Sequence, residues 1–172
     1  MTGRPSIPSP LTPPGHLKRY GSRVFDDQRH DPYQPAGKYP EPTLCGHCGA
    51  IYHKGRWQWG VAPEGARSDT CPACRRTHDK LPAGWLILDG AFVAAHRDEL
   101  IAIIRNEAEH ERREHPLNRI MQIDEQDGRV EISTTDIHLP QRIGEKLKSA
   151  YHGELTVKYA ADEYSVHLHW QR

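Results

Sequence analysis

The four cysteines of this 172-residue chain fall into two Cys-x-x-Cys pairs, and no other feature constrains its fold as strongly. The pairs are Cys45-Gly-His-Cys48 and Cys71-Pro-Ala-Cys74, and the 22 residues between them match a spacing at which two loops bind one tetrahedral metal ion. Gly46, Gly49 and Pro72 favour the tight turns that such loops need. The pattern predicts a four-thiolate zinc site made by Cys45, Cys48, Cys71 and Cys74.

Three other uses of paired cysteines compete with zinc binding. Two disulfides need an oxidising compartment, and the chain starts Met-Thr-Gly-Arg-Pro without the apolar segment of a signal peptide. A thioredoxin-type redox site needs one such motif on a βαβ unit, not two. Iron is the stronger rival, because the stretch from Cys45 to Tyr52 resembles rubredoxin. Since Arg75 and Arg76 stand where a rubredoxin has glycine, zinc is preferred and a rubredoxin-like electron carrier stays open as an alternative.

Composition indicates a polar chain with one ordinary domain and a small satellite. The apolar fraction is 36%, the mean hydropathy is −0.79, and no apolar run approaches the length of a membrane span. We therefore expect a cytoplasmic protein, with a bacterial cell as the default source.

The chain lacks the usual sequence signs of catalysis. It contains no phosphate-binding glycine-rich loop, no serine-nucleophile motif and no HExxH helix. A zinc ion held by four cysteines has no open position for water or substrate, which is typical of a structural site. We expect a protein that is not an enzyme and has no small-molecule substrate.

Residues 1–43 are predicted to form an extended or disordered tail. They hold nine of the fourteen prolines and few aliphatic residues, too little apolar surface to offset the entropy of ordering. Between His16 and Tyr39, basic and aromatic side chains alternate in a way that can bind RNA. Asp26, Asp27 and Asp31 weaken that interpretation, so a solvated linker is the preferred one.

Residues 44–82 are predicted to form the zinc ribbon. Ala50 to Trp59 reads as a β-hairpin with Lys54-Gly55 at its turn, residues 60–69 as a mobile loop, and Cys74 to Leu81 as a short helical turn. From 42 to 80 the chain has six Lys and Arg against three Asp and Glu, which suggests a phosphate-binding surface. Its candidate RNA-binding residues are Lys54, Arg56, Trp57, Arg67, Arg75, Arg76 and Lys80.

Residues 83–172 are predicted to form an α+β domain. The expected elements are a strand at 85–88, a helix at 96–114, a hairpin at 119–134 turning at Asp127-Gly128, a helix capped by residues 134–136, and strands at 154–159 and 164–171. The order β-α-β-β-α-β-β predicts a ferredoxin-like fold with an added C-terminal strand.

Side-chain periodicity predicts which residues of this domain are buried. The expected inward residues of the second helix and the last two strands are Ile143, Leu147, Ala150, Tyr151, Leu155, Val157, Tyr159, Val166, Leu168 and Trp170. The expected outward residues of the sheet lack the Phe/Tyr pair on which an RNA recognition motif stacks bases. Because residues 81–172 also have eleven Lys and Arg against sixteen Asp and Glu, we expect this domain to contact protein, not RNA.

Four stretches resemble a small bacterial zinc-ribbon family of uncharacterised function: Glu41 to Trp57, Cys71 to Cys74, Thr134-Thr-Asp-Ile-His-Leu139 and Gly153-Glu-Leu155. More distantly, the ribbon and the Thr-Thr-Asp helix are similar to the N-terminal part of the archaeal and eukaryotic adaptor that accompanies the large ribosomal subunit out of the nucleus. The resemblance implies four cysteine zinc ligands, ribosome or RNA association, and no catalytic residue. The adaptor's further domains, which contact the subunit, have no counterpart here.

These predictions are compatible with two functions from different classes. The first is a zinc-stabilised protein whose basic ribbon binds RNA or the ribosome. The second is an adaptor whose ribbon binds only protein, with an affinity much less sensitive to salt.

Overall fold

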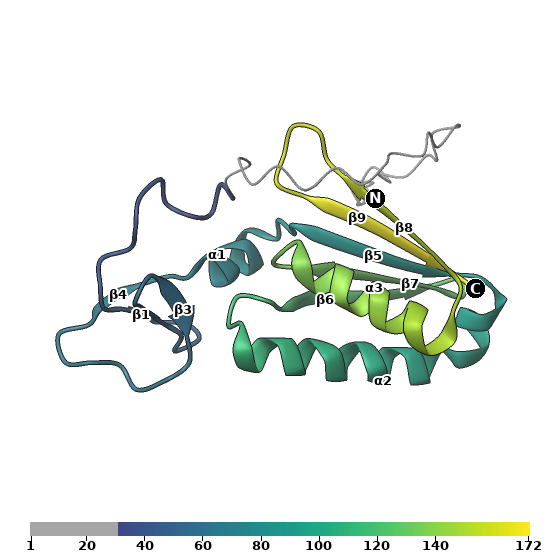
Figure 1. Ribbon diagram of the computed structural model, residues 1–172, viewed down its shortest axis with the longest axis horizontal. Coiled ribbons are helices and arrows are strands. Elements are labelled where there is room, and N and C mark those ends of the chain that lie inside the picture. The colour runs from purple at the N-terminus through teal and green to yellow at the C-terminus, as the bar shows by residue number, and fades with distance from the viewer. Residues whose placement is uncertain (1–30) are drawn as a thin grey trace, which may run out of the picture.

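The computed structural model describes residues 31–172, so the predictions made for residues 1–30 lie outside the described part of the chain. The fold is mixed α+β, with two separate sheets and three helices (Figure 1). A small four-stranded sheet carries the cysteines, and a five-stranded sheet with two long helices forms the larger domain. None of the helices in residues 31–172 has the length and apolar content that crossing a membrane requires.

The ribbon sheet has the strand order β3-β2-β1-β4. Its elements, with the short helix that follows them, are β1 (Thr43–Cys45), β2 (Ile51–His53), β3 (Arg56–Gln58), β4 (Arg67–Asp69) and α1 (Pro72–Asp79). The predicted hairpin is confirmed as β2 and β3, and the predicted helical turn as α1. The prediction of a loop over residues 60–69 is wrong at its end, because β4 pairs in parallel with β1.

The ribbon also includes residues 39–43, which the sequence analysis predicts to be part of the tail. Tyr39 is buried, and its ring centroid lies 5.1 Å from those of both Tyr52 and Trp57. The carboxylate of Glu41 accepts hydrogen bonds from the backbone N–H groups of Lys54 and Gly55, at 2.7 and 2.9 Å, and so stabilises the hairpin turn. Residues 39–43 are therefore part of the ribbon, whose small core depends on aromatic rings from both segments.

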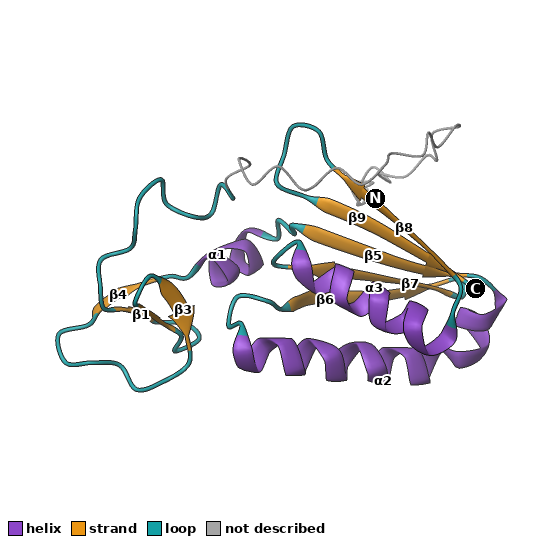
Figure 2. Ribbon diagram, viewed as in Figure 1, coloured by secondary structure: helices purple, strands orange, loops and turns teal. Residues whose placement is uncertain are grey.

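The larger domain has two layers, a five-stranded sheet and a pair of helices on one of its faces (Figure 2). Its elements are β5 (Gly84–Asp89), α2 (Ala91–Glu114), β6 (Ile120–Gln126), β7 (Arg129–Thr134), α3 (His138–Tyr151), β8 (Glu154–Tyr159) and β9 (Val166–Gln171). The predicted order of elements is thus confirmed, although α2 starts five residues earlier than expected and bends at His96, whose φ and ψ are −118° and 21°.

The strand order β6-β7-β5-β9-β8 does not confirm a ferredoxin-like topology. The first half agrees with the prediction, since β7 lies between β5 and β6 and is antiparallel to both. In the second half, however, β9 occupies the place beside β5 and runs parallel to it, while β8 forms the sheet edge. The last strand is therefore inserted into the sheet instead of being added outside it.

The edge position of β8 explains why some predicted core residues are exposed. Ile143, Leu147 and the inward side chains of β9 are buried as expected. Val157 and Tyr159 of β8 are each 42% exposed, because no further strand lies beyond them in the described residues. Ala150 is also exposed, because the apolar stripe of α3 continues from Leu147 to Tyr151, which packs against the core beside Phe92.

Two local features fix how closely β5 approaches β7 and where α3 begins. A Cβ atom at Gly84 would lie only 2.4 Å from Thr134 Oγ1, so only glycine lets β5 approach β7 this closely at that point. The carboxylate of Asp136 accepts hydrogen bonds from the backbone N–H groups of His138 and Leu139, at 2.7 and 3.1 Å. This confirms that the 134–136 segment caps the second helix.

Candidate metal centre

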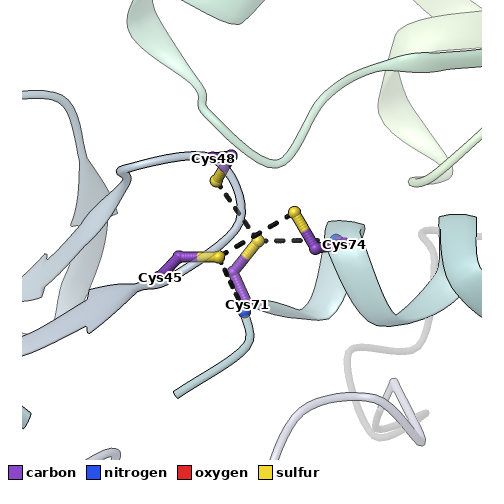
Figure 3. Close-up of side chains that lie close together, drawn as sticks. All are labelled: Cys45, Cys48, Cys71 and Cys74. Carbon is purple, nitrogen blue, oxygen red and sulfur yellow. Dashed lines mark hydrogen bonds between the residues drawn. The ribbon is translucent and has the colours of Figure 1, made fainter. Parts of the chain in front are cut away.

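The four cysteines come together from two elements of the ribbon (Figure 3). Cys45 ends β1 and Cys48 follows it in a tight turn, while Cys71 precedes α1 and Cys74 lies in the first turn of that helix. Each pair is thus positioned by a local turn, and the pairing of β1 with β4 brings the two turns together.

The spacing of the four sulfurs fits a tetrahedral metal ion. Sγ of Cys45 lies 3.8 Å from Sγ of Cys74, and Sγ of Cys48 lies 3.8 Å from Sγ of Cys71. A tetrahedron with metal–sulfur bonds of about 2.3 Å has sulfur–sulfur edges of about 3.8 Å. The thiols are free of disulfides, and all four sulfurs lie within 4.8 Å of one another. The residues present therefore fit a metal ion held by four thiolates.

Backbone amides of the second loop point at the sulfurs. The N–H of Cys71 donates to Sγ of Cys45 at 3.3 Å, and the N–H of Cys74 donates to Sγ of Cys71 at 3.4 Å. Such hydrogen bonds stabilise negative charge on sulfur and orient the side chains. Cys71 is consequently both a candidate ligand and the N-cap of α1.

A fifth residue completes the site, and it comes from the other domain. The guanidinium of Arg119 donates hydrogen bonds to Sγ of Cys48 at 3.0 Å and to Sγ of Cys74 at 3.3 Å, and lies 3.8 Å from Sγ of Cys71. One metal dication with four thiolates would have a net charge of −2, so the half-buried guanidinium of Arg119 beside the sulfurs would offset part of that charge. Arg119 makes the α+β domain part of the metal centre.

The position of Arg119 is fixed from several sides. Its Nε donates to the carbonyl of Pro116 at 2.7 Å, and its backbone N–H donates to Oγ1 of Thr135 at 3.0 Å. Thr135 Oγ1 in turn donates to the carbonyl of Leu117 at 2.6 Å. These bonds hold the guanidinium in one orientation at the start of β6. In that orientation it can donate to two sulfurs.

The electrostatics of the site favour a thiolate at Cys48. The hydrogen bond with the Cys71 thiol, the backbone N–H of Ala50 and the Arg119 guanidinium lower the pKa of Cys48 to about 4. The same hydrogen bond, together with burial, raises the pKa of Cys71. Burial opposes the charge on Arg119, but its bonds to Cys48 and Cys74 raise its pKa above the ordinary value.

A second contact joins the ribbon to the α+β domain. Nε1 of Trp59 donates to the carbonyl of Arg112, near the end of α2, at 2.7 Å. The guanidinium of Arg112 also lies 5.7 Å from the centroid of the Trp59 ring. Trp57, in contrast, packs with Cys45 and Cys71 in the ribbon core.

The candidate RNA-binding residues fall into two groups. Lys54, Arg56, Arg67 and Lys80 are exposed, and Arg75 is half-buried in an ion pair of 2.7 Å with Asp69. Trp57 is only 8% exposed and Arg76 only 3% exposed.

Burial removes Trp57 and Arg76 from the set of residues that RNA can contact, which corrects the sequence analysis. Arg76 is ion-paired with Asp31, donates to the carbonyl of Leu81, and lies over the ring of Tyr33 at 4.4 Å. The positive charge of Arg76 is therefore paired within the protein. The excess of basic residues in the ribbon sequence gave no sign of which side chains would be buried.

A second group of possible metal ligands lies on α2, but its carboxylates already have partners. The group consists of Glu107, His110 and Glu111. Glu107 pairs with Lys146 at 3.8 Å, and Glu111 pairs with Arg142 at 3.1 Å. We assign no metal to this group.

Comparison with protein families, with curated proteins and with solved structures finds no match for this chain. The chain has a mixed α+β architecture, and its four clustered cysteines can bind a metal ion at a site that Arg119 closes on one side.

Proposed function

We propose that the four cysteines bind zinc, and that the ion is structural in a protein without enzymatic activity. The observation that carries this proposal is the tetrahedral spacing of four sulfurs whose outer side is occupied by the Arg119 guanidinium. Four thiolates fill the coordination of zinc and leave no position for a substrate or a water nucleophile. Zinc supplies folding energy to a small module with little apolar core, and this ribbon is such a module.

Metal analysis tests the zinc assignment directly. Protein purified without added metal should contain about one zinc per chain and should be colourless. The rival rubredoxin-like assignment predicts bound iron and a red protein. Iron as the main metal after expression with both metals available would overturn the zinc proposal.

We further propose that the ribbon binds RNA through contacts with the phosphates, and that this RNA is part of the ribosome or of another molecule. Lys54 lies in the β2–β3 turn, Arg56 lies on β3, and Arg67 lies on β4 at the opposite edge of the small sheet. All three are exposed, and within residues 31–172 none of them makes an ion pair. Basic side chains that are not neutralised by the protein are available to phosphates. Arg75 contributes less, because Asp69 already pairs with it.

The dependence of binding on salt tests this proposal. Affinity of the zinc-loaded protein for an unstructured RNA should fall as salt rises, with the slope reduced by about 0.7 for each phosphate contact removed. Lys54→Glu and Arg56→Glu should each weaken binding, whereas Lys148→Glu, an equal charge change on exposed α3, should not. Sedimentation of lysates at low and moderate salt then tests whether the ribosome is the source of that RNA.

The second candidate function, a protein adaptor, predicts a different result from the same measurements. Binding to RNA would then be absent, and association with a protein partner would change little with salt. Equal RNA affinity in the Lys54, Arg56 and Lys148 variants would also contradict the ribbon as the RNA-binding surface.

A further inference from the structure

One cleft of the α+β domain is lined by basic and amide side chains. It lies between the end of α2 and the start of α3, has a volume of about 430 Å³, and is lined by His115, Asn118, His138, Gln141 and Arg142. Sites for small ligands typically have volumes of about 300–1,000 Å³. None of these lining residues is acidic, although residues 81–172 contain sixteen Asp and Glu. The cleft therefore differs in charge from the domain as a whole, whose excess of acids argued against contact with RNA.

Two acids of the same segments are buried and already have partners. The side chain of Glu111 is only 6% exposed, and it pairs with Nε of Arg142 at 3.1 Å. A guanidinium has five N–H donors in a fork, so a pair through Nε leaves the outer donors for a second acceptor. Asp136 is buried, and its carboxylate accepts the hydrogen bonds of His138 and Leu139 that cap α3. One acid thus holds Arg142 beside α2, and the other fixes the start of α3.

The two amide side chains of the cleft can recognise a nucleobase. Nε2 of Gln141 donates to the carbonyl of Ile137 at 2.8 Å, which leaves Oε1 and a second N–H of the same amide. The backbone N–H of Asn118 donates to the carbonyl of His115 at 2.9 Å and closes a turn after α2. An amide both donates and accepts hydrogen bonds, and Asn and Gln bind the edges of bases in this way.

The other lining groups fit the remaining parts of a nucleotide. His115 and His138 are exposed, and proteins stack unpaired RNA bases on aromatic rings that include histidine. The guanidinium of Arg142 suits a phosphate group, which it can bind with two parallel hydrogen bonds. The cleft therefore combines rings for a base, amides for its edge and a cation for its phosphate.

The cleft lies at the end of the α+β domain that is next to the ribbon. Asn118 directly precedes Arg119, whose guanidinium donates to Sγ of Cys48. Leu117 packs against the core of the ribbon. The end of α2 and the start of α3 both lie on the side of the domain that faces the ribbon (Figure 1). The basic ribbon and the cleft are therefore neighbours.

We propose that this cleft binds one unstacked nucleotide of the RNA whose phosphates the ribbon contacts, with Asn118 and Gln141 on the base edge and Arg142 on the phosphate. The inference rests on the proposed RNA binding of the ribbon and adds base preference to it. Phosphate contacts position a nucleic acid without reading its sequence, whereas contacts with base edges distinguish one base from another.

Base preference provides the test, measured by fluorescence anisotropy with the full-length, zinc-loaded chain and short labelled homopolymers of A, C, G and U. The wild type should bind one of the four about 10-fold more tightly than the others. Asn118→Ala and Gln141→Ala should each remove most of this preference and leave the salt dependence unchanged. Gln126→Ala, which removes an exposed amide of β6 outside the cleft, is the matched control and should bind like the wild type. Lys54→Glu should weaken the binding of all four RNAs equally.

The results separate this proposal from the one on which it rests. Equal affinity of the wild type for all four RNAs overturns the cleft site but leaves phosphate binding by the ribbon standing. A preference that neither amide variant changes overturns it too, because the base is then read elsewhere. Absence of RNA binding overturns both proposals. A free mononucleotide that binds as tightly as the RNA also overturns the assignment, because the cleft is then a site for small nucleotides. Circular dichroism checks that the variants are folded.

Discussion

The guanidinium of Arg119 lies 3.0 Å from Sγ of Cys48, although 71 residues separate the two in the chain. The contact joins Cys48, in the ribbon, to the residue that directly precedes β6 in the α+β domain. Because a thiolate accepts a stronger hydrogen bond than a thiol, the contact is stronger when Cys48 is deprotonated. The cysteine cluster therefore helps to hold the two domains together.

Replacing Arg119 should weaken the contact between the two domains more than it destabilises either domain. A hydrogen bond to a charged group contributes about 1.5–3 kcal/mol, and Arg119→Gln weakens two of them. Arg119→Lys keeps the charge but not the planar fork, so we expect partial rescue. Faster hydrogen exchange in α1 and in the start of β6 is the measurement. Arg113→Gln, an exposed arginine of α2, is the control and should leave exchange unchanged.

Removing one ligand should unfold the ribbon but leave the α+β domain folded. Structural zinc contributes on the order of 10 kcal/mol to the folding of a small module, so Cys48→Ser should lose the metal and the ribbon's protection from proteolysis. The neighbouring exposed residue offers a matched control, since His47→Ser should keep the metal. Unchanged metal stoichiometry in Cys48→Ser contradicts the ligand assignment.

Arg142→Ala should destabilise the α+β domain more than Lys146→Ala does. The side chain of Glu111 is only 6% exposed and Arg142 is its ion-pair partner, whereas Lys146 pairs with the more exposed Glu107 at a longer distance. Since Arg142 itself is more than half exposed, water partly compensates, and we expect a loss of about 1–3 kcal/mol. Urea unfolding of both variants measures the difference. Equal losses would show that the burial of Glu111 does not matter.

Asp136 should make the domain relatively more stable as the pH falls. Burial raises the pKa of this carboxyl above its ordinary value of 3.8, the nearby Glu111 raises it further, and the hydrogen bonds from His138 and Leu139 only partly oppose this. A carboxyl whose folded pKa is raised contributes most stability below its unfolded pKa, and this contribution is lost as the pH rises through the folded pKa.

Asp136→Asn tests this titration, because asparagine keeps an oxygen that can cap α3 but cannot ionise. The unfolding free energy of the wild type minus that of the variant should fall from acidic to neutral pH. Comparing the two proteins at each pH cancels the loss of zinc in acid, which both share. A difference that is constant with pH would falsify the assignment.

Local patterns in the sequence determined much of the fold and of the metal site. Three-residue spacing within each cysteine pair and flanking glycines and proline were enough to predict that Cys45, Cys48, Cys71 and Cys74 come together. The helical period predicted α2, and Asp127-Gly128 predicted the β6–β7 turn, where both residues have positive φ. These features depend on residues close together in the chain, so a short stretch contains the whole signal.

Only the tertiary structure decided the features that join distant segments. β9 lies between β5 and β8 because strand pairing depends on packing across the whole sheet, and an alternating apolar pattern does not name its neighbour. The same holds for Arg76, which reads as a surface cation but is buried against Asp31, and for Arg119, which reads as the start of a strand. The sequence predicted which four cysteines meet, whereas the position of a cation beside them depended on how the ribbon and the α+β domain pack together.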